Sequence, residues 1–221
     1  MFKTQNIRKI TFAVALLLPL CLTACRKDAS QIDGQAREEL RLTGHVLSGS
    51  DDSPVRIEVF SDLQCPACRE LFIRILKPAM QEYQDKVSVV YYEFPLSGHQ
   101  YALPAARYVA AANKLGRQQA LSVYDMVFND QVYWAIDGSL EASVTKALSN
   151  DDLLRMRQIL TDKASLAEIN ETIEKEQLMG MRKGVNSTPT VFISHGGREQ
   201  KVEGGALTYQ VLKQFLDPLV K

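Results

Sequence analysis

Two cysteines separated by two residues, Cys65 and Cys68, are the residues of this chain best suited to chemistry. A β-branched, apolar stretch at 55–60 precedes them and apolar residues at helical spacing follow, which predicts that the pair lies between a strand and a helix. At the first turn of a helix, the partial positive charge of the free backbone N–H groups favours a thiolate. A thiolate exchanges disulfides, and a second cysteine three positions later can resolve the mixed disulfide. The pattern therefore predicts a redox-active dithiol.

Half of a structural zinc site is the alternative interpretation of the two cysteines. Such a site takes four Cys or His ligands, commonly as two spaced pairs. The chain has no second pair, and its three histidines, His45, His99 and His195, are scattered singly. We therefore expect no metal and no other cofactor.

The first 24 residues have the pattern of an export signal, in which basic residues precede an apolar run at 10–22 that is short for a membrane span. The run ends in Leu-Thr-Ala-Cys25, which resembles the lipobox of bacterial lipoproteins. That resemblance implies cleavage before Cys25 and a lipid anchor on this cysteine. An ordinary cleaved signal peptide is the alternative. Both interpretations place the protein in an oxidising compartment outside the cytoplasm.

Charge and composition after the signal indicate a tethered single domain. The full chain has 26 basic and 26 acidic residues, and residues 1–24 carry three basic residues and no acid, so the remainder is about three charges negative. This balance gives no argument for nucleic acid as a partner. Residues 25–44 are largely polar and predict a tether, and 45–221 then form one domain. Because no separate dimerisation domain fits, we expect a monomer.

Hydrophobic periodicity predicts an α/β fold. A helix from Cys65 to about residue 83, bent at Pro78, connects the strand at 55–60 to a second strand at 87–94. A strand–helix–strand crossover of this length implies parallel strands. Helical stripes follow from about 101 to 181, one of them ended by Gly116. The remaining predicted elements are strands at 190–193 and 200–203 and a last helix at 209–216.

Four stretches together resemble the thioredoxin superfamily, and in particular its DsbA-like branch. They are Phe60-Ser-Asp-Leu-Gln-Cys-Pro-Ala-Cys68, Phe94-Pro-Leu96 with His99, Thr188-Pro-Thr190 and Val202-Glu-Gly204. The resemblance spans roughly residues 45–218. It implies a thioredoxin-like fold, with a central mixed β-sheet flanked by helices and an all-helical insertion at about 101–182.

The same resemblance implies roles for the residues around the dithiol. Cys65 is the exposed nucleophile and Cys68 the buried resolving thiol. Pro189 follows a cis peptide bond and lies against the cysteines, and Thr188 presents backbone groups to an extended substrate segment.

The two residues between the cysteines, Pro66 and Ala67, are expected to influence the pKa of Cys65. Ala67 has no side-chain donor, unlike the histidine that some strong oxidants have there, so we do not expect an extremely low pKa.

One position departs from the family pattern. Many relatives bury an acid six residues before the first cysteine, where this chain has Val59. Glu58 is adjacent, but neighbouring side chains of a strand point to opposite faces. Our hypothesis is that Asp62 influences proton movement near the thiols; its alternative role is that of a helix cap or turn residue. His99 and His195 are expected at the surface, and Trp134 in the core or a groove of the helical segment.

These features predict a thiol–disulfide oxidoreductase that oxidises the cysteines of protein substrates. A membrane quinone-linked partner of the DsbB or vitamin K epoxide reductase kind is expected to reoxidise it. A reductase or isomerase with the same fold is the first alternative, and a non-catalytic binding module or chaperone is the second.

Overall fold

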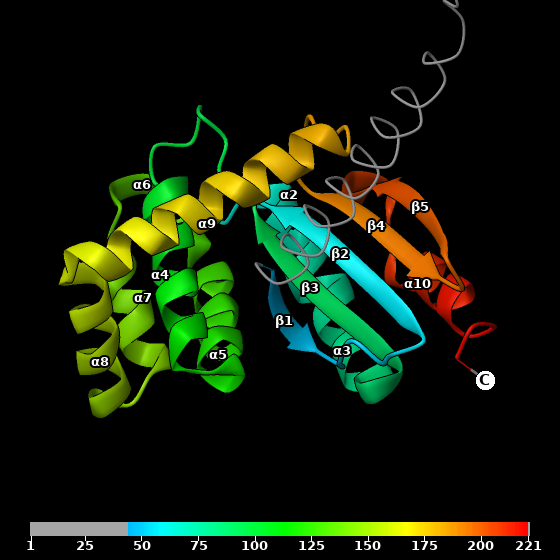
Figure 1. The fold of residues 1–221 in the computed structure, drawn as a ribbon, viewed down its shortest axis with the longest axis horizontal. Helices are drawn as coiled ribbons and strands as arrows, with labels where there is room; N and C mark the ends of the chain where they lie inside the picture. Colours follow the sequence, from blue (N-terminus) through cyan, green and yellow to red (C-terminus); the bar gives the residue numbers. More distant parts are fainter. Residues whose placement is uncertain (1–43, 221) are drawn as a thin grey trace, which may run out of the picture. The chain divides into compact units, whose positions relative to one another are not determined.

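A five-stranded mixed sheet organises residues 44–220, the part of the chain that this computed structural model describes (Figure 1). The predicted signal peptide, the predicted lipidation site Cys25 and nearly all of the predicted tether lie outside the described residues. In spatial order the strands are β1 (His45–Ser48), β3 (Val87–Glu93), β2 (Val55–Ser61), β4 (Thr190–His195) and β5 (Arg198–Glu203). Strands β2 and β3 are parallel and the other pairs are antiparallel. The predicted fold class is confirmed.

Helices follow the first parallel strand and fill the chain between β3 and β4. The helix after the cysteines consists of α2 (Pro66–Leu71), the π-helical turn η1 (Phe72–Leu76) and α3 (Lys77–Tyr83), followed by the 3₁₀ turn η2 (Gln84–Lys86). Between β3 and β4 lie α4 (Ala102–Leu115), α5 (Arg117–Asn129), α6 (Gln131–Asp137), α7 (Leu140–Ala147), α8 (Asn150–Thr161) and α9 (Lys163–Arg182). The 3₁₀ turn η3 (Gly204–Ala206) and α10 (Tyr209–Leu216) complete the described chain.

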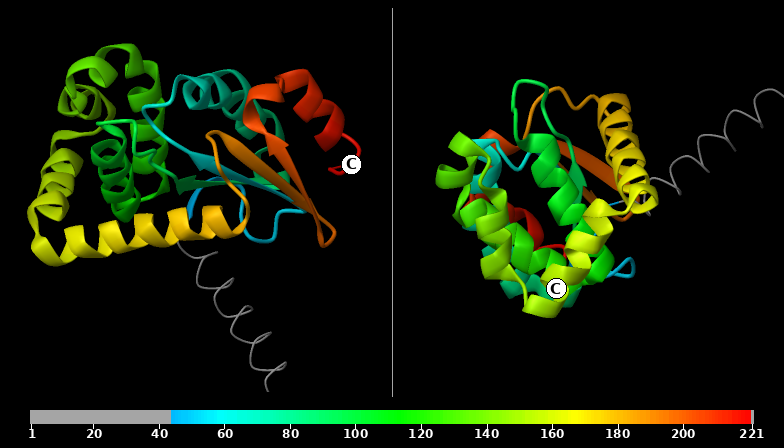
Figure 2. Two further views of the ribbon diagram at one scale, coloured as in Figure 1. Left: turned by 90° about the horizontal axis from the view of Figure 1, so that it is seen from above. Right: turned by 90° about the vertical axis from the view of Figure 1, so that its left-hand side faces the viewer.

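The two faces of the sheet are covered by different helices. Helices α2, α3 and α10 lie on one face, while the C-terminal half of α9 runs along the other (Figure 2, left). The first face contributes to the larger apolar core, which includes both cysteines and continues into the helices between β3 and β4. A smaller cluster on the second face contains Phe60, Tyr92, Phe94, Met179 and Phe192. Coverage of both faces explains why β3 is buried along its whole length.

The π-helical turn coincides with the bend that Pro78 predicts. Pro78 has no N–H, and its ring conflicts with the carbonyl of the residue four positions earlier, Arg74. The wider turn at Phe72–Leu76 lies directly before α3, in which Pro78 occupies the first turn. The helix therefore continues past the proline to Tyr83, where the sequence placed its end.

Strand β1 was missed by the sequence analysis, which assigned no strand before residue 55. It has only four residues, and its register with β3 is interrupted between Val46 and Ser48. Such a short element has too few alternating positions for a clear period-2 pattern. Pairing with β3 is what makes it a strand.

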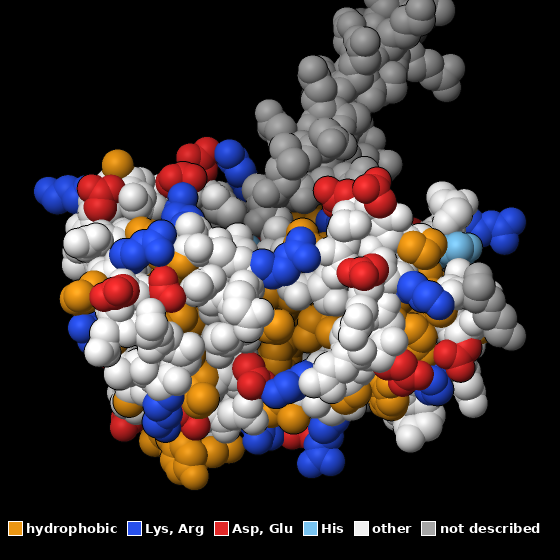
Figure 3. Space-filling view, turned by 90° about the horizontal axis from the view of Figure 1, so that it is seen from below, with side chains coloured by type: hydrophobic (Ala, Val, Ile, Leu, Met, Phe, Trp, Pro, Cys, Tyr) orange, Lys and Arg blue, Asp and Glu red, His pale blue; other side chains and the backbone are white. Residues whose placement is uncertain are grey.

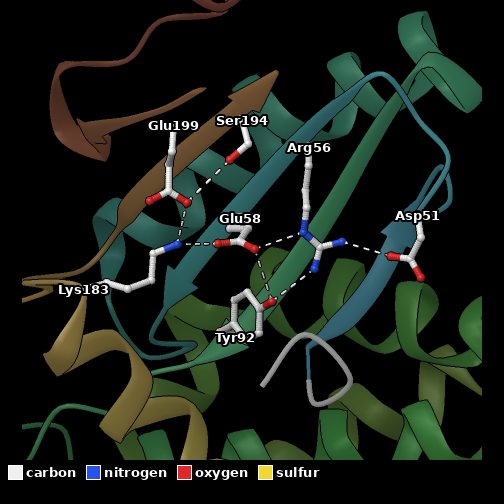
Figure 4. Close-up of polar contacts among 7 residues, drawn as sticks. All are labelled: Asp51, Arg56, Glu58, Tyr92, Lys183, Ser194 and Glu199. Carbon is white, nitrogen blue, oxygen red and sulfur yellow. Dashed lines mark hydrogen bonds and ion pairs between the residues drawn. The ribbon is translucent and has the colours of Figure 1, made fainter. Parts of the chain in front are cut away.

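A polar network on the second face joins the strands to the end of α9 (Figure 4). Glu58 of β2 accepts from Lys183 at 2.6 Å and from Arg56 at 3.0 Å, and Lys183 also contacts Glu199 of β5 at 2.8 Å. Burial opposes ionisation of Glu58, but Lys183 and Arg56 outweigh it and lower the pKa of this carboxyl. Glu58 thus forms ion pairs on the face of the sheet away from the cysteines, as the alternation of side chains along β2 predicts.

Gly180 of α9 is expected to tolerate no side chain. A Cβ atom there would lie 2.7 Å from the Phe94 ring and 2.9 Å from the Phe60 ring. Gly180→Ala should therefore lower the free energy of unfolding by about 1–3 kcal/mol through overpacking, although alanine is normally the better helix former. The urea midpoint measures this, and Gly98→Ala, where a Cβ would meet open space, is the control. A Gly180→Ala midpoint at or above that of the parent chain would contradict the packing argument.

Candidate active site

The two cysteines lie at the start of α2, directly after the loop that leaves β2. Cys65 is the N-cap residue of α2, with an extended backbone conformation, and Pro66 is the first helical residue. Proline suits that position, since the N–H it lacks would have no helical partner there. Cys65 is 7% exposed and Cys68 is fully buried, while Pro66 and Ala67 between them are exposed. Both cysteines are present as free thiols.

A loop distant in sequence covers the Cys65 sulfur. The Cys65 thiol donates to the backbone carbonyl of Thr188 at 3.5 Å. The peptide bond between Thr188 and Pro189 in this loop is cis. Pro189 itself is buried at the start of β4. The fold thus brings together Cys65, Cys68, Thr188 and Pro189, which the sequence analysis singled out from separate stretches.

The two sulfurs differ strongly in acidity. A hydrogen bond from the Cys68 thiol is the main reason that the pKa of Cys65 falls to about 5. Burial opposes this shift, and the backbone N–H groups of Cys68 and Ala67 support it. Burial raises the pKa of Cys68 well above its usual value, and the neighbouring Cys65 adds to this effect. The negative charge therefore belongs to the more exposed sulfur, where a substrate can reach it.

Two glutamines fix the loop before the cysteines to the helices between β3 and β4. The Gln131 side chain of α6 donates to the carbonyls of Leu63 at 2.7 Å and Cys65 at 3.0 Å. The Gln64 side chain donates to Ala135 of α6 at 3.1 Å and accepts from the N–H of Tyr101 at 2.7 Å. The sequence analysis missed both glutamines because no local motif marks a contact across nearly 70 residues.

Asp62 is fully buried and saturated with hydrogen bonds. Its carboxylate accepts from the N–H of Gln64 at 2.7 Å, the N–H of Leu96 at 2.8 Å and Nδ1 of His99 at 2.8 Å. These bonds support the turn role considered for this residue and connect the loop after β3 to the start of α2. His99, expected only at the surface, is also part of this arrangement.

The structure also locates three other residues that the sequence analysis considered. Val59, six positions before Cys65, is buried in the core on the cysteine side of the sheet. Trp134 is a core residue whose Nε1 donates to the carbonyl of Val127 at 2.7 Å. His195 ends β4 and contacts the carbonyl of Pro54 at 2.9 Å.

Hydrophobic side chains also line a hollow in the middle of the surface shown in Figure 3. A cleft of about 290 Å³ has Phe72, Met80 and Leu121 in its lining, and neither cysteine borders it. Within residues 44–220, no cluster of three or more His, Cys, Asp or Glu side chains is arranged to hold a metal ion. None of the helices in the same range is both long and apolar enough to cross a bilayer.

Three features define the class of fold: a dithiol at the start of a helix, a neighbouring cis-proline loop and a mixed sheet. Comparisons with known proteins identify the same class. Residues 41–217 match the family model described as thioredoxin, so the chain belongs to the thioredoxin family. A probable disulfide bond formation protein D of Bacillus cereus is 27% identical over 196 residues, which cover 84% of this chain and 86% of that protein. Disulfide bond formation protein D of Bacillus subtilis is 21% identical over 188 residues, or 81% and 79% of the two chains.

Solved structures show the same fold. Wolbachia pipientis alpha-DsbA1 has a TM-score of 0.63 and 18% identity, covering 80% of this chain and 90% of that one. Oxidised BdbD from Bacillus subtilis also has a TM-score of 0.63, with 17% identity and coverage of 80% and 93%. At these identities the likeness concerns the arrangement of the backbone.

The acidity of the two thiols can be measured by ultraviolet absorbance of the thiolate in the reduced full-length protein. We expect one thiolate to form with a midpoint near pH 5 and the second to remain protonated to pH 9 and beyond. Cys65→Ser should remove the transition near pH 5, which assigns it. A first midpoint near 8.5, the value for an unperturbed cysteine, would contradict the described environment of Cys65.

Proposed function

We propose that this protein is a thiol–disulfide oxidoreductase that oxidises pairs of cysteines in protein substrates outside the cytoplasm. The observation that carries the proposal is the asymmetric thiol pair, in which Cys65 is acidic and 7% exposed while Cys68 is fully buried and protonated. The names of the Bacillus relatives, which refer to disulfide bond formation, support the same chemistry.

The oxidising reaction proceeds in two exchange steps. A substrate thiolate attacks Cys65 of the Cys65–Cys68 disulfide, so that a substrate–Cys65 bond forms, the bond between the two enzyme sulfurs breaks and the electron pair stays on Cys68. A second substrate thiolate then attacks the substrate sulfur of the mixed disulfide and expels Cys65 as a thiolate. The substrate is released with a new disulfide, and the enzyme, which has gained two electrons, is left in its reduced form with two thiols.

The acidity of Cys65 supports the oxidising direction. A thiolate stabilised at pH 7 is a good leaving group and lowers the energy of the reduced enzyme, which makes the enzyme disulfide a stronger oxidant. The pKa of about 5 lies between the values of roughly 7 for thioredoxin and 3.5 for DsbA. In this proposal Pro66 and Ala67 influence that acidity.

The substrate is expected to bind as an extended segment beside the cis-proline loop. Thr188 offers its backbone next to the Cys65 sulfur, and Pro189 holds the loop in place at the start of β4. An extended peptide that pairs with such backbone groups needs no particular side-chain sequence, which fits an enzyme that acts on many proteins.

The remaining parts of the proposal concern the cell envelope. Residues 1–24 act as the export signal, Cys25 carries the lipid anchor and residues 25–44 tether the domain comprising 45–221 to the membrane. The protein works as a monomer, and a membrane quinone-linked protein of the DsbB or vitamin K epoxide reductase kind removes its electrons. The lipobox-like sequence supports the anchor.

The reduction potential separates an oxidase from a reductase. Titration of the full-length protein against glutathione should place it well above thioredoxin's roughly −270 mV and nearer to DsbA's roughly −120 mV. A value at or below that of thioredoxin would assign the protein to the reductase alternative.

Single cysteine variants test the assigned roles. With a peptide that contains a disulfide, the Cys65 thiolate of Cys68→Ser should attack that bond, release one peptide thiol and accumulate as a mixed disulfide, because no resolving thiol remains in the enzyme, whereas Cys65→Ser should form none. Peptide oxidation by the Cys65→Ser, Cys68→Ser double variant would show that the reaction occurs elsewhere. Peptide binding of undiminished affinity by an inactive double variant, with no oxidation by the parent chain, would favour the binding module.

A further inference from the structure

Four buried hydroxyl groups have no hydrogen-bond partner within residues 44–220, and two of them belong to Ser61 and Tyr91. The Cys68 sulfur accepts a hydrogen bond from the N–H of Asp62, the residue after Ser61, at 3.4 Å. The Ser61 side chain favours the Cys68 thiolate, and a negative charge on Cys68 helps, after burial, to raise the pKa of Tyr91. Buried polar groups without a partner are rare in folded proteins and call for an explanation. The exchange steps described above give these hydroxyls no role.

The register of β2 and β3 places a carboxyl group next to these hydroxyls. Ser61 is opposite Glu93, and Val59 is opposite Tyr91. Neighbouring strands lie about 4.8 Å apart, and paired residues share a face. Tyr91 is influenced by both Cys68 and Glu93. Ser61 therefore lies next to Glu93 on the cysteine face of the sheet, and Tyr91 shares that face two positions before Glu93.

Glu93 is fully buried, and burial favours its neutral form. The titratable groups around it come from every element packed there: Asp62 before α2, Tyr91 on β3 itself, His45 on β1, Tyr124 on α5 and Glu176 on α9. Burial is the main cause that raises the pKa of Glu93 to about 8; the hydrogen bond from Tyr124 opposes the shift and Asp62 adds to it. Burial also lowers the pKa of His45 to about 4, so its ring, 2.7 Å from the Tyr124 hydroxyl, brings no positive charge at pH 7.

We infer that Glu93 supplies the proton that Cys68 takes up when the Cys65–Cys68 disulfide opens, through the hydroxyls of Ser61 and Tyr91. The inference rests on the proposed function. As the substrate thiolate bonds to Cys65, the electron pair of the broken bond moves to Cys68, which cannot remain charged in the core. A hydroxyl donates its proton to that sulfur and receives one from Glu93, which becomes a carboxylate and is later reprotonated from solvent. When the enzyme is reoxidised, the proton moves in the opposite direction.

Other carboxyl groups near the thiols are less suited to this transfer. Both oxygens of Asp62 are engaged by three donors, and Glu58 is paired with Lys183 and Arg56 on the opposite face. Val59, on the cysteine face, has no titratable group. On this face the acid is Glu93 of β3, the strand that neighbours β2, whereas Val59 occupies the position six residues before Cys65.

The rate at which reduced glutathione opens the disulfide of the oxidised full-length protein tests the inference, measured from pH 5 to pH 9.5 for the parent chain and for Glu93→Gln. We expect the variant to be slower on the order of a hundredfold at pH 6, the size of a typical general-acid contribution. The difference should vanish above about pH 8, where the parent carboxyl has lost its proton. A purely structural defect would slow the reaction by the same factor at every pH, and that result would overturn the inference.

Further variants separate this proton path from its alternatives. Glu58→Gln removes a buried carboxyl from the other face of β2 and should show no pH-dependent difference. The Ser61→Ala, Tyr91→Phe double variant leaves Glu93 in place and should reproduce the Glu93→Gln profile, which keeps the test decisive if Glu93→Gln does not fold. If Asp62→Asn showed this pH-dependent slowing and Glu93→Gln did not, the inference would be overturned and Asp62 would be the proton donor. Failure of the parent chain to react with glutathione at any pH would instead refute the proposed function.

Discussion

The hydrogen bond between the two thiols, formed where a helix begins, is the interaction on which the site depends. Its donor, Cys68, lies fully in the core, and its acceptor, Cys65, keeps 7% of its surface exposed and lies among backbone N–H groups of the first helical turn. The contact therefore lowers the pKa of one sulfur and raises that of the other. Two cysteines that were equally exposed would share the charge, and no sulfur would be marked as the nucleophile.

Alternate side chains of β2 point to opposite faces of the sheet, so an ionised polar network lies on one face and the thiols lie on the other. On one face of β2, Glu58 is an ionised member of a network with Lys183 and Arg56 that connects strands and helix ends (Figure 4). On the other face, Ser61 approaches the thiols and has no ionised partner. A slip of one residue in the register of β2 would exchange these sets and place a charged carboxylate against the reactive sulfurs.

The helices between β3 and β4 contribute directly to the site. Gln131 of α6 holds the cysteine loop by two carbonyls, and Tyr124 of α5 and Glu176 of α9 surround Glu93. The same helices occupy the long stretch of chain that separates Cys65 from Thr188, 123 positions later. They therefore both complete the environment of the thiols and deliver the cis-proline loop to them.

The local chemistry could be predicted from the residues alone: the spacing of Cys65 and Cys68, the strand before them, the helix bent at Pro78, and the fold class that these patterns and the family resemblance imply. These features depend on side-chain type and short-range periodicity, which a single sequence displays. The tertiary structure decided which groups surround the sulfurs, because that depends on strand register and helix packing over long separations. His99 thus became a partner of Asp62, β1 formed only by pairing with β3, and Glu93 became a buried, neutral acid beside Ser61 and Tyr91. A residue's type shows which reactions it can undergo, but its burial and its neighbours set the charge that it carries.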